Sequence, residues 1–528
     1  MIPRVVSQTI GGNALAAAFI SGAAPPGWYE QTPSGAESWR ERAETVRSTT
    51  SQDWLTRLAP AFEATGNAKQ RLEASANGRG VVVTTGQQPG LFGGPIYTLS
   101  KALSALAFAN ALEQAIGVPV APVFWAATDD TDFKEASSTV VSVTGGPRLL
   151  RIDHPETLGR TMASMPLGEV SDQLEALTQG AGATIDRVPL DLLAQFYTKK
   201  QTVGSAYVSF LRALFEPLGI AVIDASHPAT RAAASPVLSE ALRKAPEVAA
   251  AVSERNHDIE QGGYSIQVQD VPGLSLVFTS ASGGRKRIPI KAAAKQKVSD
   301  DMGPNVLLRP VIERAILPTA TYIGGPAEIA YFAQISPIAD TLGVGRPAIV
   351  PRWSCTVIEP HVEKILEKLY LLPEDLRDPH EVETRVARSR LSEEVLAEID
   401  KTRAMLDERL DALTRAVDEG ATPVAPAVTG GLHANLLRRL DRFERRLIAA
   451  TKRQHAETMT EIATARGSLY PFGKPQERSL NFVPLLARYG PPLREEMLRE
   501  AERHATRLLG ASSISEPEQA AVAGRVES

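Results

Sequence analysis

Residues 81–94, with the sequence VVVTTGQQPGLFGG, decide the fold class of this chain. Residues 81–85 are all β-branched, which is typical of a buried strand. They lead into a glycine-rich loop, and Pro95 follows, a residue suited to the first turn of a helix. Leucines at helical spacing continue from Leu99 to Leu112. The stretch therefore predicts a strand, a glycine-rich loop and a helix in succession.

A second strand is predicted at residues 120–127, VAPVFWAA, directly before an acidic cluster. Strand, helix and strand form a βαβ unit, in which both strands end at the same edge of a parallel sheet. The loop and the cluster Asp129, Asp130 and Asp132 should therefore emerge side by side, where open α/β sheets bind ligands. Such carboxylates could hold a magnesium nucleotide, bind a substrate ammonium or act as a base. The alternative is that they cap a helix starting near Phe133.

The loop at residues 86–94 matches neither the GxGxxG fingerprint nor a P-loop, because no Gly-Lys-Ser/Thr follows it. Its glycines would let backbone N–H groups approach a phosphate or a carboxylate, and the helix after Pro95 would add its positive end. The alternative is a tight turn with structural glycines. We favour the anion-binding interpretation.

The sequence predicts an α/β core over residues 1–375, with a Rossmann-like parallel sheet. Residues 140–300 are interpreted as inserted segments, including a β-meander at 264–290 with turns at 270–273 and 283–284. A second glycine loop with its flanking residues, 317–326, precedes a predicted helix at 326–342 and a strand at 348–352. These elements would extend the parallel sheet.

Residues 376–467 are predicted to form an antiparallel helical coiled coil. Apolar positions repeat at intervals of three and four from Leu391 to Val417, and again from Leu432 to Leu447, with the turn at 420–426. Arms of ~40 residues would be roughly 60 Å long. Because arms of that length cannot bury their seam in a compact domain, the hairpin should project or dimerise. Residues 468–528 are expected to pack back on the core, with a disordered tail from about 516.

Composition excludes several classes of protein. The 528 residues include 57 Lys and Arg, 61 Asp and Glu, and one cysteine. The net charge of −4 argues against a dedicated binder of nucleic acid or of an anionic membrane. No stretch approaches the ~20 consecutive apolar residues that span a bilayer, so the cytoplasm is the expected location. Cys355 alone allows neither a disulfide framework nor a Cys-ligated structural zinc, and the eight histidines show no metal-ligating spacing. No metal-ligating residue is predicted.

Three further features have two interpretations each. A basic run between residues 285 and 297 could contact phosphates, but we favour a solvated hairpin edge protected by lysines. His227 follows a predicted strand and could line the sheet edge or act as a local cap. Cys355, close to Trp353, is interpreted as a small core residue rather than a nucleophile.

Four segments resemble those of the BshC family, the cysteine-adding enzymes of bacillithiol biosynthesis. They are TTGQQPGLFGGPIYTLSKALSAL at 84–106, PVFWAATDDTDF at 122–133, LRPVIERAILPTATYIGGPAEIAYFAQ at 308–334 and LYPFGKPQERSLN at 469–481. The resemblance covers essentially the whole chain. It implies a Rossmann-like core related to class I nucleotidyltransferases and cysteinyl-tRNA synthetases, with inserted connecting segments. It also implies a coiled coil that takes part in homodimerisation.

The resemblance implies a set of binding residues. The matching positions are Gly86, Gln87, Gln88, Gly90 and Gly94 in the first loop, which also holds Gly93; Tyr322, Gly324, Gly325, Pro326 and Glu328 in the second; and Gln476, Glu477, Arg478 and Asn481 near the C-terminus. Where the family commonly has Glu-Asp-His-Asp-Phe, this chain has Asp129-Asp130-Thr131-Asp132-Phe133. Either the histidine is dispensable as a proton shuttle, or the substrate differs. Pro475 stands where leucine is usual.

The reaction implied by the resemblance is the addition of cysteine to glucosaminyl-malate. An amide bond does not form from a free carboxylate and an amine in water without activation, so ATP with Mg²⁺ is the expected cofactor. Gln87 and Gln88 would orient the substrate, and Asp129 or Asp132 would bind the cysteine ammonium or deprotonate the incoming amine. Lys474 and Arg478 are the cations expected to contact the nucleotide.

Two alternatives to this reaction stay open. One is a non-catalytic nucleotide-binding scaffold whose coiled coil recruits pathway enzymes, and the other is a ligase that uses a different amino acid. Because a zinc site built from cysteines is excluded, recognition of a thiol substrate would have to rest on pocket shape and polar contacts.

Overall fold

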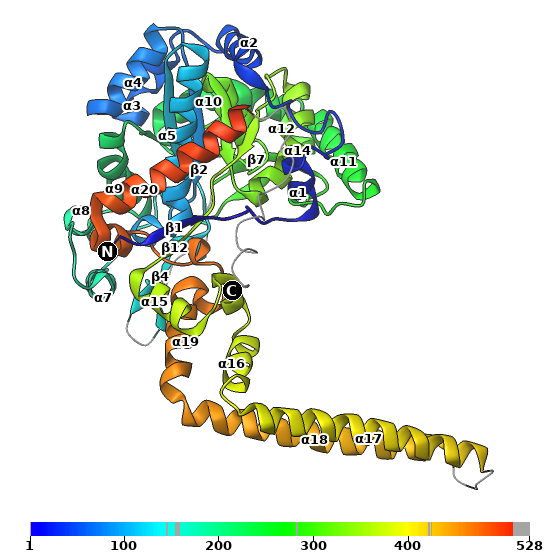
Figure 1. The fold of residues 1–528 in the computed structure, drawn as a ribbon. Helices are drawn as coiled ribbons and strands as arrows, with labels where there is room; N and C mark the ends of the chain where they lie inside the picture. Colours follow the sequence, from blue (N-terminus) through cyan, green and yellow to red (C-terminus); the bar gives the residue numbers. More distant parts are fainter. Residues whose placement is uncertain are drawn as a thin grey trace. The chain divides into compact units, whose positions relative to one another are not determined.

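The computed structural model describes residues 2–143, 146–153, 159–280, 284–420, 423 and 425–510. The chain forms two compact units (Figure 1). The first contains Met1–Val143, Arg148–Val357 and Gln476–Ser528, and the second contains Thr144–Pro147 and Ile358–Pro475. The tail predicted from residue 516 lies outside the described residues, and the turns predicted at 283–284 and 420–426 lie partly outside them.

A five-stranded parallel sheet forms the centre of the first unit. In spatial order its strands are β11 (Ile349–Pro351), β10 (Thr319–Gly324), β2 (Val81–Gln87), β3 (Val120–Ala126) and β6 (Ala221–Asp224). The predicted βαβ unit is confirmed, with α5 (Ile96–Ile116) crossing from β2 to β3. Residues 319–324, predicted as part of a loop, instead form β10, in which every residue is buried. The strand order reverses beside β2, since the chain runs outward through β3 and β6 and returns on the other side.

Alternate residues of β2 pack into different cores. Val81 and Val83 belong to one apolar cluster, and Val82 belongs to the other. The first cluster includes residues of α2 (Gly35–Ser48), α5, α9 (Val203–Phe215) and α20 (Val483–Gly510). The second includes residues of α3 (Trp54–Phe62), α4 (Gly66–Asn77), α10 (Pro228–Arg243) and α14 (Pro326–Leu342). Helices therefore cover both faces of the sheet, which confirms the α/β, Rossmann-like fold class and explains why β2 is apolar on both sides.

The remaining elements of the first unit surround this core. Its other α-helices are α1 (Ala14–Ile20), α6 (Phe133–Ala136), α7 (Ser171–Ala181), α8 (Val188–Phe196), α11 (Ala245–Gln261), α12 (Ile290–Ala293) and α13 (Arg309–Ile316), and its short 3₁₀ helices are η1 (Leu91–Gly93), η2 (Glu216–Leu218) and η5 (Gln476–Arg478). Two strand pairs lie outside the main sheet: β1 (Arg4–Ser7) with β12 (Cys355–Ile358), and β4 (Ser138–Val143) with β5 (Gly146–Arg151). Cys355 is fully buried on β12, as expected of a core residue.

A small antiparallel sheet is formed by β8 (Lys286–Pro289), β7 (Leu274–Thr279) and β9 (Met302–Pro304), in that spatial order. The meander predicted at 264–290 is therefore wrong in one strand, because residues 264–273 form no strand and β9 supplies the third. The physical reason is a side chain that replaces a partner strand. The amide of Gln334 accepts from the N–H of Val268 at 3.1 Å and donates to its carbonyl at 2.8 Å.

The second unit is helical, with α15 (Pro360–Leu369), η3 (Pro373–Arg377), α16 (Pro379–Arg388), α17 (Glu393–Glu419), α18 (Pro426–Gln454), α19 (Ala456–Leu469) and η4 (Pro471–Gly473). α17 and α18 lie antiparallel and side by side (Figure 1), and Arg403 joins them through ion pairs to Asp441 at 2.6 Å and Glu444 at 3.0 Å. The arms have 27 and 29 residues, hence about 40 Å each, shorter than predicted. They are shorter because α17 begins only after its N-cap Ser392, and α18 ends at its C-cap His455.

Several apolar side chains of this hairpin are exposed, among them Met405, Leu413, Leu432 and Phe443. Dimerisation through the hairpin stays a prediction. Across the part of the chain that the structure describes, no helix has both the length and the apolar character needed to cross a membrane.

Candidate active site

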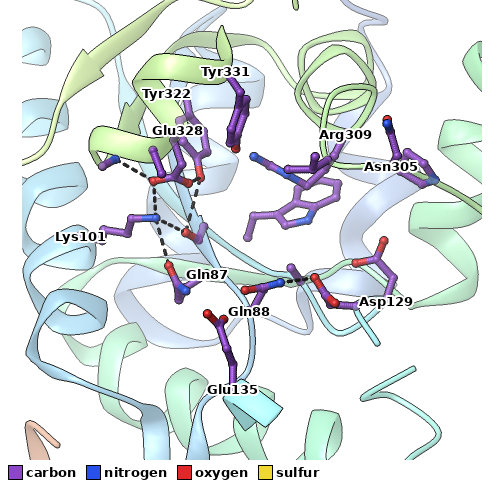
Figure 2. Close-up of a pocket in the computed structure, with 18 of the residues that line it drawn as sticks. Gln87, Gln88, Lys101, Asp129, Glu135, Asn305, Arg309, Tyr322, Glu328 and Tyr331 are labelled. Carbon is purple, nitrogen blue, oxygen red and sulfur yellow. Dashed lines mark hydrogen bonds and ion pairs between the residues drawn. The ribbon is translucent and has the colours of Figure 1, made fainter. Parts of the chain in front are cut away.

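A cavity of about 470 Å³ opens at the carboxyl ends of β2, β3, β10 and β11, where the strand order reverses (Figure 2). Open α/β sheets bind ligands at such switch points, and the volume is typical of small-molecule sites. The sheet edge contributes Gly86, Gln87, Gln88, Trp125, Ala127, Asp129, Asp130, Tyr322, Gly325 and Arg352. Other elements contribute Tyr97, Lys101, Glu135, Phe278, Arg285, Arg287, Pro304, Asn305, Val306, Arg309, Pro326, Ala327, Glu328, Tyr331 and Arg478.

Lys101 of α5 is a buried ammonium that joins the end of β2 to the start of α14 (Figure 2). Its Nζ donates to the carbonyl of Gly86 at 2.8 Å and to Oε1 of Gln87 at 3.1 Å. It also pairs with Oε2 of Glu328 at 2.5 Å, and the two side chains are only 4% and 17% exposed. Lys101 therefore connects both glycine loops that the sequence singled out.

Glu328 accepts hydrogen bonds from two further donors in addition to Lys101. It accepts from the hydroxyl of Tyr322 at 2.6 Å and from the N–H of Gly325 at 2.7 Å, which caps the start of α14. Burial raises the pKa of Glu328, but the charge and hydrogen bond of Lys101, with these two donors, outweigh burial and lower it. Glu328 is therefore an ionised carboxylate held by three donors.

The two glutamines of the first loop are oriented by fixed partners. Nε2 of Gln88 donates to Oδ2 of Asp130, whose Oδ1 accepts from the N–H of Thr131 at 2.5 Å and of Asp132 at 2.9 Å. Nε2 of Gln87 donates to the hydroxyl of Tyr97 at 3.1 Å. The predicted meeting of the first loop with the acidic cluster is thus confirmed, and both amides are held by the protein itself.

The acidic cluster divides into residues inside and outside the cavity. Asp129 lines it with a partly buried side chain, and burial, opposed by Arg285 and reinforced by Asp130, raises its pKa. Asp132 is exposed and does not line the cavity. Its carboxylate caps α6, accepting from the N–H of Lys134 at 3.1 Å. The helix-cap interpretation is therefore correct for Asp132. Asp129 and Asp130 lie at the sheet edge where ligand binding was predicted.

Glu135 is a cavity residue that sequence reasoning missed. It belongs to the short helix α6, which Asp132 caps, and points into the cavity (Figure 2). Burial, with smaller contributions from Asp132 and Asp130, raises its pKa. The available signal was its place in the first turn of the helix predicted to start near Phe133, directly after the acidic cluster. The described lining contains no histidine, and His227 caps α10 by accepting from the N–H of Ala229 at 3.1 Å.

Two more buried ion pairs support the cavity wall. Arg309 pairs with Glu313 at 2.7 Å, and its guanidinium lies 5.2 Å from the ring centroid of Tyr322. Arg352 forms a bidentate pair with Glu477 at 2.9 and 2.6 Å. Glu477 belongs to the C-terminal motif, so this pair brings that motif to the edge of the sheet. Neither arginine could be assigned from the sequence. Glu477 is distant from Arg352 along the chain, and Glu313 is one helical turn from Arg309 but forms no recognised motif with it.

Residues 90–94 of the first loop pack inside the protein, and Gly90, Gly93 and Gly94 do not line the cavity. The N–H of Gly93 donates to the hydroxyl of Tyr197 at 3.0 Å, and the first N–H of α5, that of Ile96, donates to the carbonyl of Leu480 at 2.9 Å. These donors therefore have protein partners. The structural-turn alternative describes this part of the loop, and only residues 86–88 reach the cavity.

Gln476 and Asn481 also use their amides inside the protein. Gln476 accepts from the N–H of Val357 at 2.8 Å and donates to its carbonyl at 2.9 Å. Asn481 donates to the carbonyls of Leu91 at 3.2 Å and Phe92 at 3.0 Å. Both residues hold the framework behind the cavity rather than line it. Gly324, at the end of β10, likewise does not line it and packs against Ile349.

The packing of Gly93 leads to a stability prediction. A Cβ at this position would lie 2.7 Å from Cε1 of Phe210 and 2.9 Å from Cζ of Phe482, at a φ of +86°. We expect Gly93→Ala to lower the free energy of unfolding by about 2–4 kcal/mol, through overpacking and backbone strain together. Urea unfolding measures this. Gly117→Ala is the matched control, since Gly117 has a φ of +71° with nothing within 4 Å, and should lose only about 1–2 kcal/mol. Equal losses would contradict the packing argument.

Arg285 and Arg287 line the cavity, whereas Lys286 between them is exposed and does not. Alternate residues of a strand face opposite sides, which explains the difference. The solvated-edge interpretation is therefore wrong for the two arginines. Arg478 also lines the cavity. Lys474 is an exposed residue of the second unit, and its nucleotide contact stays a prediction.

A doubly covered parallel sheet with a charged cavity at its switch point defines the first unit as a Rossmann-like α/β domain with a small-molecule site. The family model "Bacillithiol biosynthesis BshC, N-terminal Rossmann-like domain" matches residues 13–301 and 290–353. The model "Bacillithiol biosynthesis BshC, C-terminal coiled-coil domain" matches residues 355–508. The chain belongs to the BshC family, and the resemblance inferred from the four motifs is confirmed.

Relatives from several bacteria align with most of the chain, each named "Putative cysteine ligase BshC". The Solibacter usitatus protein is 30% identical, over 78% of this chain and 80% of its own length. The Koribacter versatilis protein is 32% identical, over 82% and 83%. The Staphylococcus carnosus protein is 27% identical, over 78% and 83%.

Proposed function

We propose that this protein is a ligase that uses ATP to join cysteine to glucosaminyl-malate in bacillithiol biosynthesis. Membership of the BshC family and the names of its relatives support the reaction class. The observation that carries the proposal is the lining of the cavity. Pre-oriented amides, carboxylates with raised pKa values and arginines meet there at the switch point of the sheet.

ATP, when bound, supplies the phosphoryl or adenylyl group that makes the cysteine carboxylate an acyl donor. The cavity suits an anionic ligand, because Arg478 lines it and forms no ion pair within the described part of the chain. Arg478 is the residue we propose for the phosphates. A nucleotide contact of Lys474, which belongs to the second unit, stays a prediction from the sequence. Mg²⁺ would arrive with the nucleotide, since protein sites hold it largely through substrate phosphates and water.

Residues of the protein then bind, orient and deprotonate the amine of the acceptor. The acceptor nitrogen bonds to the acyl carbon, the C–O bond to the activating group breaks, and phosphate or AMP leaves. We assign Asp129 as the group that takes the proton released from the nitrogen, because burial raises its pKa toward the range useful for a base. Gln88, held by Asp130, orients the reacting groups. Gln87 is oriented in turn by Lys101 and Tyr97. With threonine at 131, carboxylates take the proton-transfer role that a histidine could otherwise serve.

The test is product formation by the purified full-length protein from ATP, cysteine and glucosaminyl-malate, followed by mass spectrometry. We expect Gln88→Ala to lower kcat/KM by about 10²-fold, since misplacement of a positioning group by ~1 Å has effects of that size. Asp132→Asn is the matched control, because asparagine keeps the helix cap and removes only the charge. It should retain activity within about threefold of wild type.

Four other results would contradict parts of the proposal. Full activity in Gln88→Ala would show that Gln88 does not orient the reacting groups. A large loss of kcat/KM in Asp132→Asn would show that the charge of Asp132 is needed for activity. No turnover by the wild type with any amino acid would favour the nucleotide-binding scaffold, and turnover with an amino acid other than cysteine would favour the related ligase.

A further inference from the structure

The six cations that line the cavity fall into two groups. Lys101, Arg309 and Arg352 each pair with a buried carboxylate, of Glu328, Glu313 and Glu477 respectively. Arg285, Arg287 and Arg478 form no ion pair with any residue that the structure describes. The first group is already neutralised by the protein. The second group is available to the anionic groups of a ligand.

Arg285 and Arg287 are held in place by contacts other than an ion pair, although the charges of Asp129 and Asp270 act on Arg285 and Arg287 respectively. Their guanidinium carbons lie 4.3 and 5.5 Å from the ring centroid of Phe278, on the neighbouring strand β7. Phe278 is the cross-strand partner of Arg287 in the β7–β8 pair. Arg285 also donates from Nη2 to the carbonyl of Pro304 at 2.7 Å. Cation–π stacking and this one hydrogen bond orient the two guanidiniums, and most of their N–H donors have no partner among the residues that the structure describes.

The spacing of the two arginines indicates the shape of the anion. Arg287 lies on β8 and Arg285 directly precedes it. In extended backbone, residues two apart have side chains on the same side, about 7 Å apart. Planar guanidinium groups bind planar carboxylates through two parallel hydrogen bonds. A small molecule with two carboxylates therefore matches the pair. Guanidinium groups also bind phosphates, so the phosphates of a nucleotide are the competing anion.

The opposite charge lies close by. Asp129 is near enough to Arg285 for their charges to interact, and Asp130 lies beside Asp129 in the same lining. A ligand with a dicarboxylate at one end and an amine at the other would meet both groups at once.

We propose that Arg285 and Arg287, stacked on Phe278, form the subsite for the malate dicarboxylate of the acceptor and thereby direct its amine toward Asp129. This inference rests on the proposed ligase function and names the part of the site that selects the acceptor. The phosphates of the nucleotide are the competing anion, which the experiment distinguishes.

The test compares Arg285→Gln and Arg287→Gln with Lys286→Gln in the full-length protein. Lys286→Gln is matched, because it removes the same charge from the same strand on the face away from the cavity. We expect each arginine variant to raise KM for glucosaminyl-malate by about 10–100-fold, the effect of losing hydrogen bonds to a charged group. KM values for ATP and cysteine should stay within about twofold, as should all three constants for Lys286→Gln. Thermal unfolding checks that each variant is folded.

A truncated acceptor sharpens the test. Methyl glucosaminide has the amine but no malate, so wild type should use it as poorly as the arginine variants use the whole acceptor. The variants should lose little more when the malate is removed. If removing the malate lowers the activity of the variants by the same factor as it lowers that of the wild type, the arginines and the malate act independently. That result would overturn the proposal.

Calorimetric binding of glucosaminyl-malate separates this inference from the ligase proposal, since it needs no turnover. Weaker acceptor binding in Arg285→Gln and Arg287→Gln, with wild-type binding in Lys286→Gln, supports the subsite even if no product forms. A rise in KM for ATP instead of the acceptor would assign the arginines to the phosphates and overturn the proposal. Unchanged acceptor binding in the arginine variants, or no binding by wild type, would also overturn it.

Discussion

Lys101→Met should lower the free energy of unfolding by about 3–5 kcal/mol, because it leaves the carboxylate of Glu328 buried without its cation. Glu328 is 17% exposed, so water cannot replace the lost ammonium fully. Oε1 of Gln87 loses the ammonium as a donor at the same time, and the carbonyl of Gly86 keeps only the longer hydrogen bond from the hydroxyl of Tyr322 at 3.4 Å. Urea unfolding followed by tryptophan fluorescence measures the change in stability. Activity should fall as well, since Gln87 loses one of the two groups that orient it.

The double variant Lys101→Met with Glu328→Gln separates stability from positioning. Replacing both members of a buried ion pair by neutral groups is often close to neutral, so most of the lost stability should return. Activity should not return, because Gln87 still lacks the ammonium. Wild-type stability in Lys101→Met alone would contradict the role of the ion pair. Full activity in the double variant would show that Lys101 does not position Gln87.

Asp129→Asn should lower kcat by about 10²–10⁴-fold, the range for loss of a general base. The base must be ionised, so kcat/KM of the wild type should fall as the pH drops through the raised pKa of Asp129. In Asp129→Asn this acidic limb should disappear. The measurement is kcat/KM against pH for both proteins with saturating ATP and cysteine.

Stability provides a second readout for Asp129. Its folded-state pKa is raised, so its contribution to stability is fully present below the unfolded pKa and is lost as the pH rises through the folded pKa. Ionisation of Asp129 therefore disfavours the folded state, and Asp129→Asn should unfold at the same or a higher urea concentration. Loss of activity with retained stability would mark a functional residue.

Glu135→Gln is the comparison variant, since Glu135 is a second carboxylate of the same cavity with a raised pKa. We expect it to keep the acidic limb of the pH profile. If Glu135→Gln removes that limb and Asp129→Asn does not, the base is Glu135 and the assignment of Asp129 is wrong.

Local patterns predicted the central elements of this protein. The β-branched run at 81–85 is buried on both faces in β2, and the βαβ unit followed from apolar spacing within about 50 residues. The coiled-coil hairpin followed in the same way from its three-four repeat. These signals lie in neighbouring residues, so a sequence is enough to find them.

Pairings between distant segments could not be predicted in this way. β10 was missed as a strand because its glycine-rich end has the pattern of a loop, and only its place between β2 and β11 makes it a strand. The predicted strand at 264–269 failed because the side chain of Gln334 satisfies Val268 instead. Lys101 is one polar residue within an apolar helix, and its meaning depends on Glu328, which lies more than 200 positions away.

Local periodicity and motifs were enough to identify the fold class, the family and the sheet edge at which the cavity opens. Which polar residues face that edge depends on the packing of segments that are distant in the sequence. The tertiary structure placed Asp129 inside and Asp132 outside, moved Arg285 and Arg287 from a solvated edge into the cavity, and assigned Gly93 and Asn481 to the framework. The physical reason is that burial and charge pairing are set by side chains from separate elements, which no local pattern records.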